Sequence, residues 1–458
     1  MLTLKSTLLN RFGAFLQKHQ RFIRWLQWVI IIAYFILLIV PSCMDLPPYS
    51  ANIFNNLAIF AKFIFWGLWW PGVILSMLVL GRFWCGIFCP EGALSEIASE
   101  KLSRGHTIPR WIKWKGWPFL AFALTTIYGQ LISVYDYAKP ALLILGGSTL
   151  AAIIIGIYYG QRGTRVWCRY LCPVNGVFNL LSRLAPISFK TDIEKWANYT
   201  DTHTANFRCA PMINIHQLQG VSACHMCGRC DGFRNSVNLT SRSVNEEIVS
   251  LGALKTTSWD RILLTYGMIA LAIGAFTWTK NPHFIPYKQA LAEWLINHNI
   301  LWPLNANAPW WALTNYPSLG DKFTWLDGFC IISYILIYCI ILGGFLNLIL
   351  RLVYYTAKKK ILIDHFSMAL LPLAFAGLFL GLSSTSINLL NFSGIALPCV
   401  NFLRSIILAL CGLWSIYLAI QILQRYKLST FILTKCLIAF LPAPTAIIAI
   451  WGYMFWIW

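Results

Sequence analysis

Two short motifs in the chain place pairs of cysteines at the same spacing. Both read Arg-x-Trp-Cys-x-x-x-Cys-Pro, at 82–90 and at 165–173, so the second copy follows the first by 83 residues. If each segment is helical, its two cysteines lie on one face, and the proline after them suits a chain that leaves a helix. Four thiolates suit an iron–sulfur cluster or zinc. The repeat therefore predicts one shared metal site with the candidate ligands Cys85, Cys89, Cys168 and Cys172.

A third motif has the cysteine spacing of a bacterial ferredoxin. It reads Cys-x-x-Cys-x-x-Cys at 224–230, but Arg234 stands where a ferredoxin has its fourth cysteine. In two-cluster ferredoxins the fourth ligand of one cluster comes from the other motif, and a Cys-Ala-Pro sequence lies 15 residues upstream of this one. We therefore expect one [4Fe–4S] cluster with the ligands Cys209, Cys224, Cys227 and Cys230.

Other residues in and near these motifs allow two interpretations. Zinc would also suit four cysteines, and His216 or His225 could replace Cys209 as the fourth ligand. The motif arginines could orient thiolates or bind lipid phosphate, and the motif tryptophans could line the site or anchor the membrane interface. The remaining cysteines occur singly in or near apolar runs and are expected to be bystanders: Cys43, Cys330, Cys339, Cys399, Cys411 and Cys436.

The elements that must position these motifs are strongly apolar. Of 458 residues, 58% are hydrophobic and 11% are charged, whereas about 25% of an ordinary soluble domain is charged. This excludes a soluble enzyme and predicts an all-α polytopic membrane protein with a small cytoplasmic ferredoxin-like iron–sulfur loop domain. About nine apolar runs are long enough to cross a hydrocarbon layer of ~30 Å. They lie at roughly 25–42, 63–81, 117–135, 140–159, 262–279, 328–350, 366–386, 403–424 and 436–456.

The basic residues predict the orientation of these runs. With a cytoplasmic N-terminus, 30 of the 36 Lys and Arg residues lie on the cytoplasmic side. The positive-inside rule then favours a multi-pass protein of the bacterial inner membrane with an extracytoplasmic C-terminus. The first apolar run lacks a clear small-residue cleavage site, so we expect a retained anchor. The predicted parts are a four-helix membrane unit at 1–160, a cytoplasmic loop at 161–261, and a five-helix membrane unit at 262–458 with an extracytoplasmic aromatic-rich segment at 281–326.

Several other kinds of chemistry lack the residues that they need. None of the eight histidines lies within an apolar run, which argues against a haem held by two histidines in the membrane. No motif for covalent haem or for nucleotide binding is present. Carboxylates are confined to the ends of the runs and to loops, which argues against an ion pump. The net charge of +20 reflects orientation in the membrane, so nucleic acid is not an expected partner.

The repeated motifs, flanked by apolar runs and followed by the ferredoxin-type loop, make residues from about 20 to 260 resemble the membrane-bound polyferredoxin family. This family includes the NapH-type quinol dehydrogenase subunit of nitrate respiration, the NosR-type protein of nitrous oxide respiration and the CcoG-type oxidase assembly factor. Its members usually carry two ferredoxin clusters, whereas this chain has one recognisable, altered motif. The resemblance implies electron transfer between membrane quinol and a redox partner protein, with a quinone site among the first four runs that no residue identifies.

Three functions are consistent with these residues. The main expectation is a membrane-bound iron–sulfur protein that passes electrons between membrane quinol and a respiratory partner, as a component of a quinol-linked oxidoreductase. The second is an assembly factor that reduces a metal, such as copper, for a terminal oxidase, because paired thiols suit Cu(I). The third is a membrane redox sensor or a structural metal-binding protein. Membrane lipid is an expected partner in each case.

Overall fold

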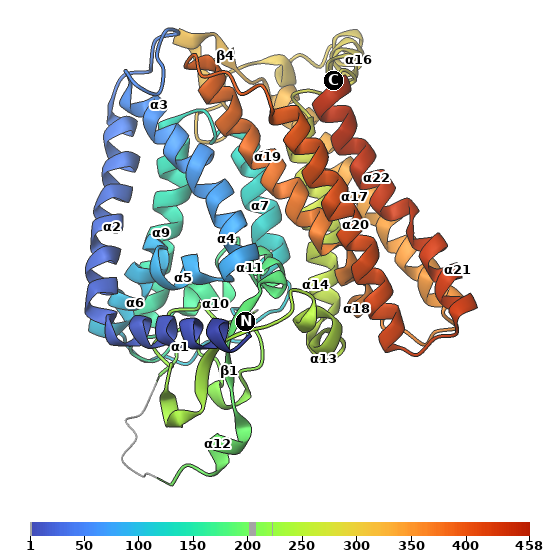
Figure 1. Ribbon diagram of the computed structural model, residues 1–458. Helices are drawn as coiled ribbons and strands as arrows, with labels where there is room; N and C mark the ends of the chain where they lie inside the picture. The colour runs from blue at the N-terminus through green and yellow to red at the C-terminus, as the bar shows by residue number, and fades with distance from the viewer. Residues whose placement is uncertain (1, 201–207, 222) are drawn as a thin grey trace. The chain divides into compact units, whose positions relative to one another are not determined.

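The computed structural model describes residues 2–200, 208–221 and 223–458, and these residues are mostly helical (Figure 1). Eight of the described helices are long and apolar enough to cross a membrane. This confirms the predicted class of a helical, multi-pass membrane protein. The eight are Gln20–Cys43, Leu57–Leu80, Ala138–Tyr158, Ser258–Thr277, Trp325–Thr356, Ile363–Phe392, Val400–Arg425 and Thr430–Ile457.

The run predicted at 117–135 forms a shorter helix than the other eight. Helix α7 (Trp117–Leu131) has 15 residues, which is roughly 22 Å at 1.5 Å per residue. The helix stops before Ser133, whose φ of 49° lies in the left-handed region that an α-helix cannot contain. By length alone, the described candidates are therefore eight where the sequence predicts about nine.

The α-helices of the first half are α1 (Leu2–Lys18), α2 (Gln20–Cys43), α3 (Leu57–Lys62), α4 (Trp70–Leu80), α5 (Phe83–Ile87), α6 (Pro90–Leu102), α7 (Trp117–Leu131), α8 (Ala138–Ala141), α9 (Gly147–Tyr158), α10 (Val166–Tyr170), α11 (Asn175–Leu181) and α12 (Ile193–Ala197). Those of the second half are α13 (Gly252–Lys255), α14 (Ser258–Ile262), α15 (Ala272–Thr277), α16 (Phe284–Asn297), α17 (Trp325–Thr356), α18 (Ile363–Ser367), α19 (Leu371–Phe392), α20 (Val400–Arg425), α21 (Thr430–Phe440) and α22 (Pro442–Gly452).

Short 3-10 and π-helical segments and four strands complete the described elements. The helical segments are η1 (Phe63–Trp69), η2 (Leu142–Gly146), η3 (Ser182–Leu184), η4 (Ile215–Gln217), η5 (Phe233–Asn235), η6 (Glu247–Leu251), η7 (Leu263–Leu271), η8 (Trp302–Leu304), η9 (Pro317–Leu319), η10 (Met368–Leu370) and η11 (Tyr453–Ile457). The strands are β1 (Ile187–Thr191), β2 (Val237–Ser241), β3 (Asn315–Tyr316) and β4 (Asp321–Lys322).

The chain folds into two compact units, each built from separate segments. Unit 1 contains Met1–Val40, Gly72–Ala121 and Leu145–Leu251, and unit 2 contains Pro41–Pro71, Phe122–Ile144 and Gly252–Trp458. All three cysteine motifs belong to unit 1. The predicted parts at 1–160, 161–261 and 262–458 are contiguous stretches, and that organisation stays a prediction.

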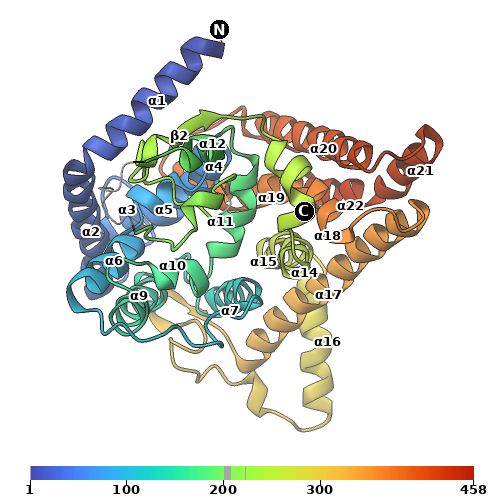
Figure 2. The same cartoon turned by 90° about the horizontal axis from the view of Figure 1, so that it is seen from below.

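In unit 1, helices α6 and α9 pack closely because one position carries no side chain. A Cβ atom at Gly156 of α9 would lie 2.6 Å from the carbonyl oxygen of Ser95 on α6. At the start of the unit, α1 lies across the end of α2, as both cartoon views show (Figures 1 and 2). Helix α1 packs on the ferredoxin-type loop, where a Cβ atom at Gly228 would lie 2.3 Å from Cβ of Leu16.

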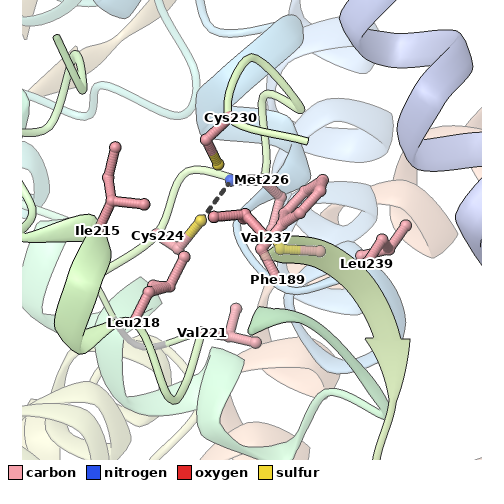
Figure 3. Packing of buried hydrophobic residues seen from close by; sticks show 9 residues of the cluster. All are labelled: Phe189, Ile215, Leu218, Val221, Cys224, Met226, Cys230, Val237 and Leu239. Carbon is pink, nitrogen blue, oxygen red and sulfur yellow. Dashed lines mark hydrogen bonds between the residues drawn. The ribbon is translucent and has the colours of Figure 1, made fainter. Parts of the chain in front are cut away.

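The ferredoxin-type loop is anchored by a two-stranded antiparallel ribbon. Strands β1 and β2 pair with Phe189 opposite Leu239. Alternate residues of β2 are buried, and β1 buries Ser188, Phe189 and Thr191, so the ribbon packs one face on a core. That core contains two of the loop cysteines, Cys224 and Cys230, among apolar side chains (Figure 3).

Unit 2 is built around the long helix α17. Thr324 caps its N-terminus and forms a capping box with Asp327, which satisfies two otherwise unpaired amides. Lower on the helix, Asn347 accepts a hydrogen bond from Arg261, which also forms an ion pair with Asp364 at 2.6 Å. Polar groups placed among apolar helices are thus paired with one another.

Candidate metal centres

The two repeated motifs fold in the same way. Each contains one short helix, α5 in the first copy and α10 in the second, and each helix begins directly after the motif arginine. In both copies the amide of the second cysteine donates to the carbonyl of the motif tryptophan at 3.0 Å, from Cys89 to Trp84 and from Cys172 to Trp167. The sequence repeat is therefore also a repeat of local structure.

One helical face for each cysteine pair was expected only if its motif stayed helical, and the first motif does not stay helical as far as its second cysteine. Helix α5 ends at Ile87, and Cys89 is extended, with φ −71° and ψ 116°. The cause is Pro90, because a residue that precedes proline is sterically disfavoured in the α conformation. Cys89 instead caps α6, and its sulfur accepts a hydrogen bond from the amide of Gly92 at 3.4 Å. The start of the following helix thus positions the second cysteine.

The four cysteines of the repeat lie close together within unit 1. Burial raises the pKa of Cys89 and of Cys172, and in each case Cys168 raises it further. A Cβ atom at Gly92 would lie 3.4 Å from the carbonyl oxygen of Cys85 and 3.6 Å from the sulfur of Cys168. Both copies of the motif therefore face one site, which we call the repeat site.

Burial makes the thiols of Cys89, Cys168 and Cys172 hard to ionise without a bound cation, because it raises the pKa of each. Burial raises the pKa of Cys168 to about 12, although Arg165 acts in the opposite direction. Metal ligation requires the thiolate form, and a buried anion is stable only when it is paired. A metal centre would supply that pairing for all four cysteines at once.

Each motif arginine donates hydrogen bonds to the other copy of the repeat or to a residue next to it. Arg165 of the second copy donates to the carbonyl oxygens of Cys85 and Gly86 in the first. Arg82 of the first copy donates to Oδ1 of Asn175, just after the second, at 2.8 Å. Both guanidinium groups are buried. Of the two interpretations, the arginines therefore hold the two copies together and do not face lipid phosphate.

The motif tryptophans differ in what they contact. The indole N–H of Trp167 donates to the carboxylate of Glu91 at 3.2 Å, and the side chain is buried. Ser148 donates to the same carboxylate. Burial raises the pKa of Glu91, and these two donors lower it. Trp167 thus lines the repeat site, whereas Trp84 is only half-buried and packs on Phe88.

The ferredoxin-type cysteines surround a small cavity in unit 1, which we call the loop site. All four predicted ligands line it, together with His225, Gly228 and a set of mostly apolar residues. The backbone directs N–H groups at the sulfur atoms: Met226 donates to Cys224 at 3.3 Å (Figure 3), and Ile213 donates to Cys209. Hydrogen bonds of this kind to cysteine sulfur tune iron–sulfur centres.

The loop-site cysteines also affect one another electrostatically. Burial, with a smaller contribution from Cys227, raises the pKa of Cys209 to about 11. Burial and the other three cysteines all raise the pKa of Cys230. The four cysteines therefore line one cavity, although among the described residues no three Cys, His, Asp or Glu side chains converge on a single metal position. Four cysteines around an apolar cavity, with N–H donors on sulfur, fit a [4Fe–4S] cluster.

One of the two alternative histidines lies at this cavity. His225 is buried in its wall, and neither ring nitrogen has a hydrogen-bond partner. Burial lowers the pKa of His225 well below its usual range, as do Arg82, Arg165 and Arg169, so the imidazole is neutral. His216, by contrast, packs its ring on Trp196 and does not line the cavity.

The repeat site and the loop site touch through backbone atoms. A Cβ atom at Gly86, inside the first motif, would lie 2.1 Å from the carbonyl oxygen of His225 and 3.1 Å from the amide nitrogen of Cys227. Only glycine allows this approach. The contact therefore includes Cys227 of the loop site and lies one residue along the chain from Cys85 of the repeat site.

Sequence reasoning missed Glu96, the carboxylate that joins these segments. Its side chain is fully buried and forms ion pairs with Arg24, Arg165 and Arg229. Burial alone would raise the pKa of Glu96, but the three guanidinium groups lower it to about 2. The available signal was an acidic residue among the small residues of 92–99, in a chain with only 16 acidic residues.

The cysteines predicted to be bystanders all belong to unit 2, whereas the cysteines of both sites belong to unit 1. Those within the apolar helices of unit 2 are buried in its packing, and Cys43 and Cys399 are exposed. No disulfide joins any of the cysteines, all of which lie within the described residues.

Gly228 provides a test of how α1 fits onto the loop site. Gly228→Ala should destabilise unit 1 strongly, because the glycine has φ +75° and the new methyl group would overlap Leu16. Gly232→Ala is the matched control, since it has φ +72° and no atom within 4 Å. The control should lose about 1–2 kcal/mol from backbone strain alone. Thermal unfolding in detergent compares the two, and equal losses would show that α1 does not pack on the loop.

A family described as "4Fe-4S binding domain" matches the chain at residues 63–109 and 143–192. Each matched segment contains one copy of the repeated motif, and the match does not reach the ferredoxin-type loop. The chain thus contains a region similar to a 4Fe–4S binding domain, and this supports an iron–sulfur cluster as the cofactor.

Two curated proteins are similar to part of the chain. The "Putative electron transport protein YccM" of Escherichia coli K12 is 22% identical over 224 residues, which is 44% of this chain and 62% of that protein. The "Uncharacterized protein MJ0749" of Methanocaldococcus jannaschii is 23% identical over 165 residues, 34% of this chain and 63% of that protein. The chain therefore spans a little over three fifths of each relative. No solved structure matches it.

Proposed function

We propose that this chain is a membrane-bound protein that transfers electrons between two iron–sulfur clusters, one at each four-cysteine site. The observation that carries the proposal is the backbone contact of Gly86 with the segment from His225 to Cys227. Two redox sites this close would exchange electrons directly. The name of the relative from Escherichia coli, an electron transport protein, supports the same class of function.

The proposed ligands divide into two sets. Cys209, Cys224, Cys227 and Cys230 would hold the loop-site cluster, and Cys85, Cys89, Cys168 and Cys172 would hold a cluster at the repeat site. When bound, such clusters accept and release one electron at a time. The protein excludes water from both sites by burial, and it supplies cationic groups nearby that favour the more negative, reduced state.

The position of the repeat site next to candidate membrane helices supports a proposed direction of electron flow. The repeat site lies between α5, α6 and α10, directly after the candidate spans that end at Leu80 and Tyr158. We propose that membrane quinol delivers electrons at this site and that a redox partner protein receives them from the loop site. The protein would then be a component of a quinol-linked oxidoreductase in a bacterial inner membrane.

A shared repeat site also constrains the number of membrane crossings between the two copies of the motif. Its cysteines come from both sides of α7, and the span Ala138–Tyr158 lies between them. For both copies of the motif to reach one side of the membrane, a second segment between Cys89 and Cys168 must also cross. We propose that α7 crosses despite its length, so that nine crossings place the C-terminus outside.

Thiol labelling tests this topology. A membrane-impermeant maleimide added to intact cells should label Cys399, which is exposed and predicted to lie outside, and Cys399→Ser should reduce that labelling. The same reagent should reach the ferredoxin-type cysteines only after the membrane is opened. Labelling of Cys227 in intact cells would contradict the proposed orientation.

The loop-site assignment is tested by removing one ligand at a time. Cys224→Ser should lose about half of the iron and one of two cluster signals in electron paramagnetic resonance, because its site would hold about four of about eight iron atoms. Cys209→Ser should have the same effect if it is the fourth ligand. Cys399→Ser should change neither quantity. Unchanged iron in Cys224→Ser would contradict a cluster at the loop site.

A further inference from the structure

Glu96 connects three segments that lie far apart in the sequence. Its carboxylate accepts hydrogen bonds from Arg165 at 2.7 Å and from Arg24 at 3.1 Å, and it forms an ion pair with Arg229. Arg24 lies on the membrane helix α2, Arg165 begins the second repeated motif, and Arg229 lies between two ferredoxin-type cysteines. One buried anion thus holds both cysteine sites and the first membrane helix.

Arg165 contacts Glu96 and also interacts with residues of both cysteine sites. Its guanidinium group donates to the backbone of Cys85 and Gly86, and it interacts electrostatically with Cys168 of the repeat site and Cys227 of the loop site. The side chain is almost completely buried. Charges that are shielded from water interact more strongly than exposed charges.

Arg229 fixes the loop site to the same carboxylate. Its Nε donates to Oε1 of Gln20 at 3.1 Å, and Nε2 of Gln20 in turn donates to the carbonyl oxygen of Cys227. The loop between Cys227 and Cys230 is therefore held on α2 through two polar contacts. Loss of Glu96 would release Arg229 and leave Arg165 without its counter-charge.

We infer that Glu96 is a positioning residue for electron transfer, whose fixed negative charge lowers the reduction potentials of both cysteine sites and whose three ion pairs keep the two sites in contact. The inference rests on the proposed function, because it requires redox centres at those sites. Glu96 lies outside the three cysteine motifs and is not among the proposed ligands.

Two substitutions predict shifts of opposite sign. Glu96→Gln keeps the shape of the side chain and removes one negative charge, so the midpoint potentials of both centres should move to more positive values. Arg24→Gln removes one of the cations that neutralise Glu96, so both midpoints should move to more negative values. Glu100→Gln is the matched control, since Glu100 is half-exposed on the same helix and pairs with Arg24 only.

The experiment is a potentiometric titration of the purified full-length chain, followed by electron paramagnetic resonance, with iron counted in every sample. Opposite shifts in Glu96→Gln and Arg24→Gln, with no shift in Glu100→Gln, support the inference. Equal midpoints in all variants that retain iron overturn it while leaving the proposed function intact. If Glu96→Gln fails to retain iron, the sign of the shift in Arg24→Gln decides. Wild-type protein without iron and sulfide would instead defeat the proposed function itself.

Discussion

Replacing Cys85 with serine is expected to remove the same iron and the same spectroscopic signal as replacing Cys168 with serine. The two residues belong to different copies of the motif, but the structure brings both to the repeat site. Each variant should therefore lose about four iron atoms per chain, and the double variant should lose no more than either single one. Iron and sulfide analysis with electron paramagnetic resonance measures this.

Two control variants show whether a loss of iron is specific to the repeat site. Cys339→Ser alters a buried cysteine of unit 2 and should leave the iron content unchanged. Cys224→Ser should remove a different signal from that lost in Cys85→Ser. Additive losses in the double variant Cys85→Ser/Cys168→Ser would contradict a shared site, because they would mean that each copy of the motif binds its own metal.

Arg165→Met is expected to be the most destabilising single change outside the cysteines. It leaves the carboxylate of Glu96 buried with one partner fewer and removes the donors to Cys85 and Gly86. Removing one member of a buried ion pair typically costs about 3–5 kcal/mol. Thermal unfolding in detergent should therefore show a large loss of stability.

Two further variants test why Arg165→Met loses stability. Arg165→Lys separates the charge from the hydrogen-bond geometry, and Lys195→Met compares a buried with an exposed ion pair. Lysine keeps the positive charge but cannot donate as a planar fork, so Arg165→Lys should recover only part of the loss. Lys195 forms an exposed ion pair with Asp192, and Lys195→Met should leave stability unchanged. If Arg165→Met unfolds at the same temperature as the wild type, the buried network does not hold unit 1 together.

Much of the architecture could be predicted from the sequence because lipid imposes simple rules. Apolar runs predicted the eight long helices, since a chain in hydrocarbon must satisfy its backbone polar groups within helices. The repeated motif predicted two similar local structures, which the matching hydrogen bonds of Cys89 and Cys172 confirm. The shared helical face required each motif to stay helical, and the first does not, because Pro90 disfavours the α conformation at Cys89.

The contacts between the sites could not be predicted in this way. Gly86 approaches the backbone of His225 across about 140 residues of chain, and no spacing rule relates the two positions. The same holds for Glu96, whose partners come from three distant segments. Such pairings depend on how helices pack, and packing is not encoded in a local pattern.

The central claim is that the chain carries two iron–sulfur clusters, and one measurement tests it most directly. The full-length protein is purified anaerobically in detergent, iron, zinc and acid-labile sulfide are counted per chain, and the dithionite-reduced sample is examined by electron paramagnetic resonance. The account predicts about eight iron and eight sulfide per chain, with signals from two centres that interact magnetically. Zinc without sulfide would contradict it and would leave a structural metal-binding protein.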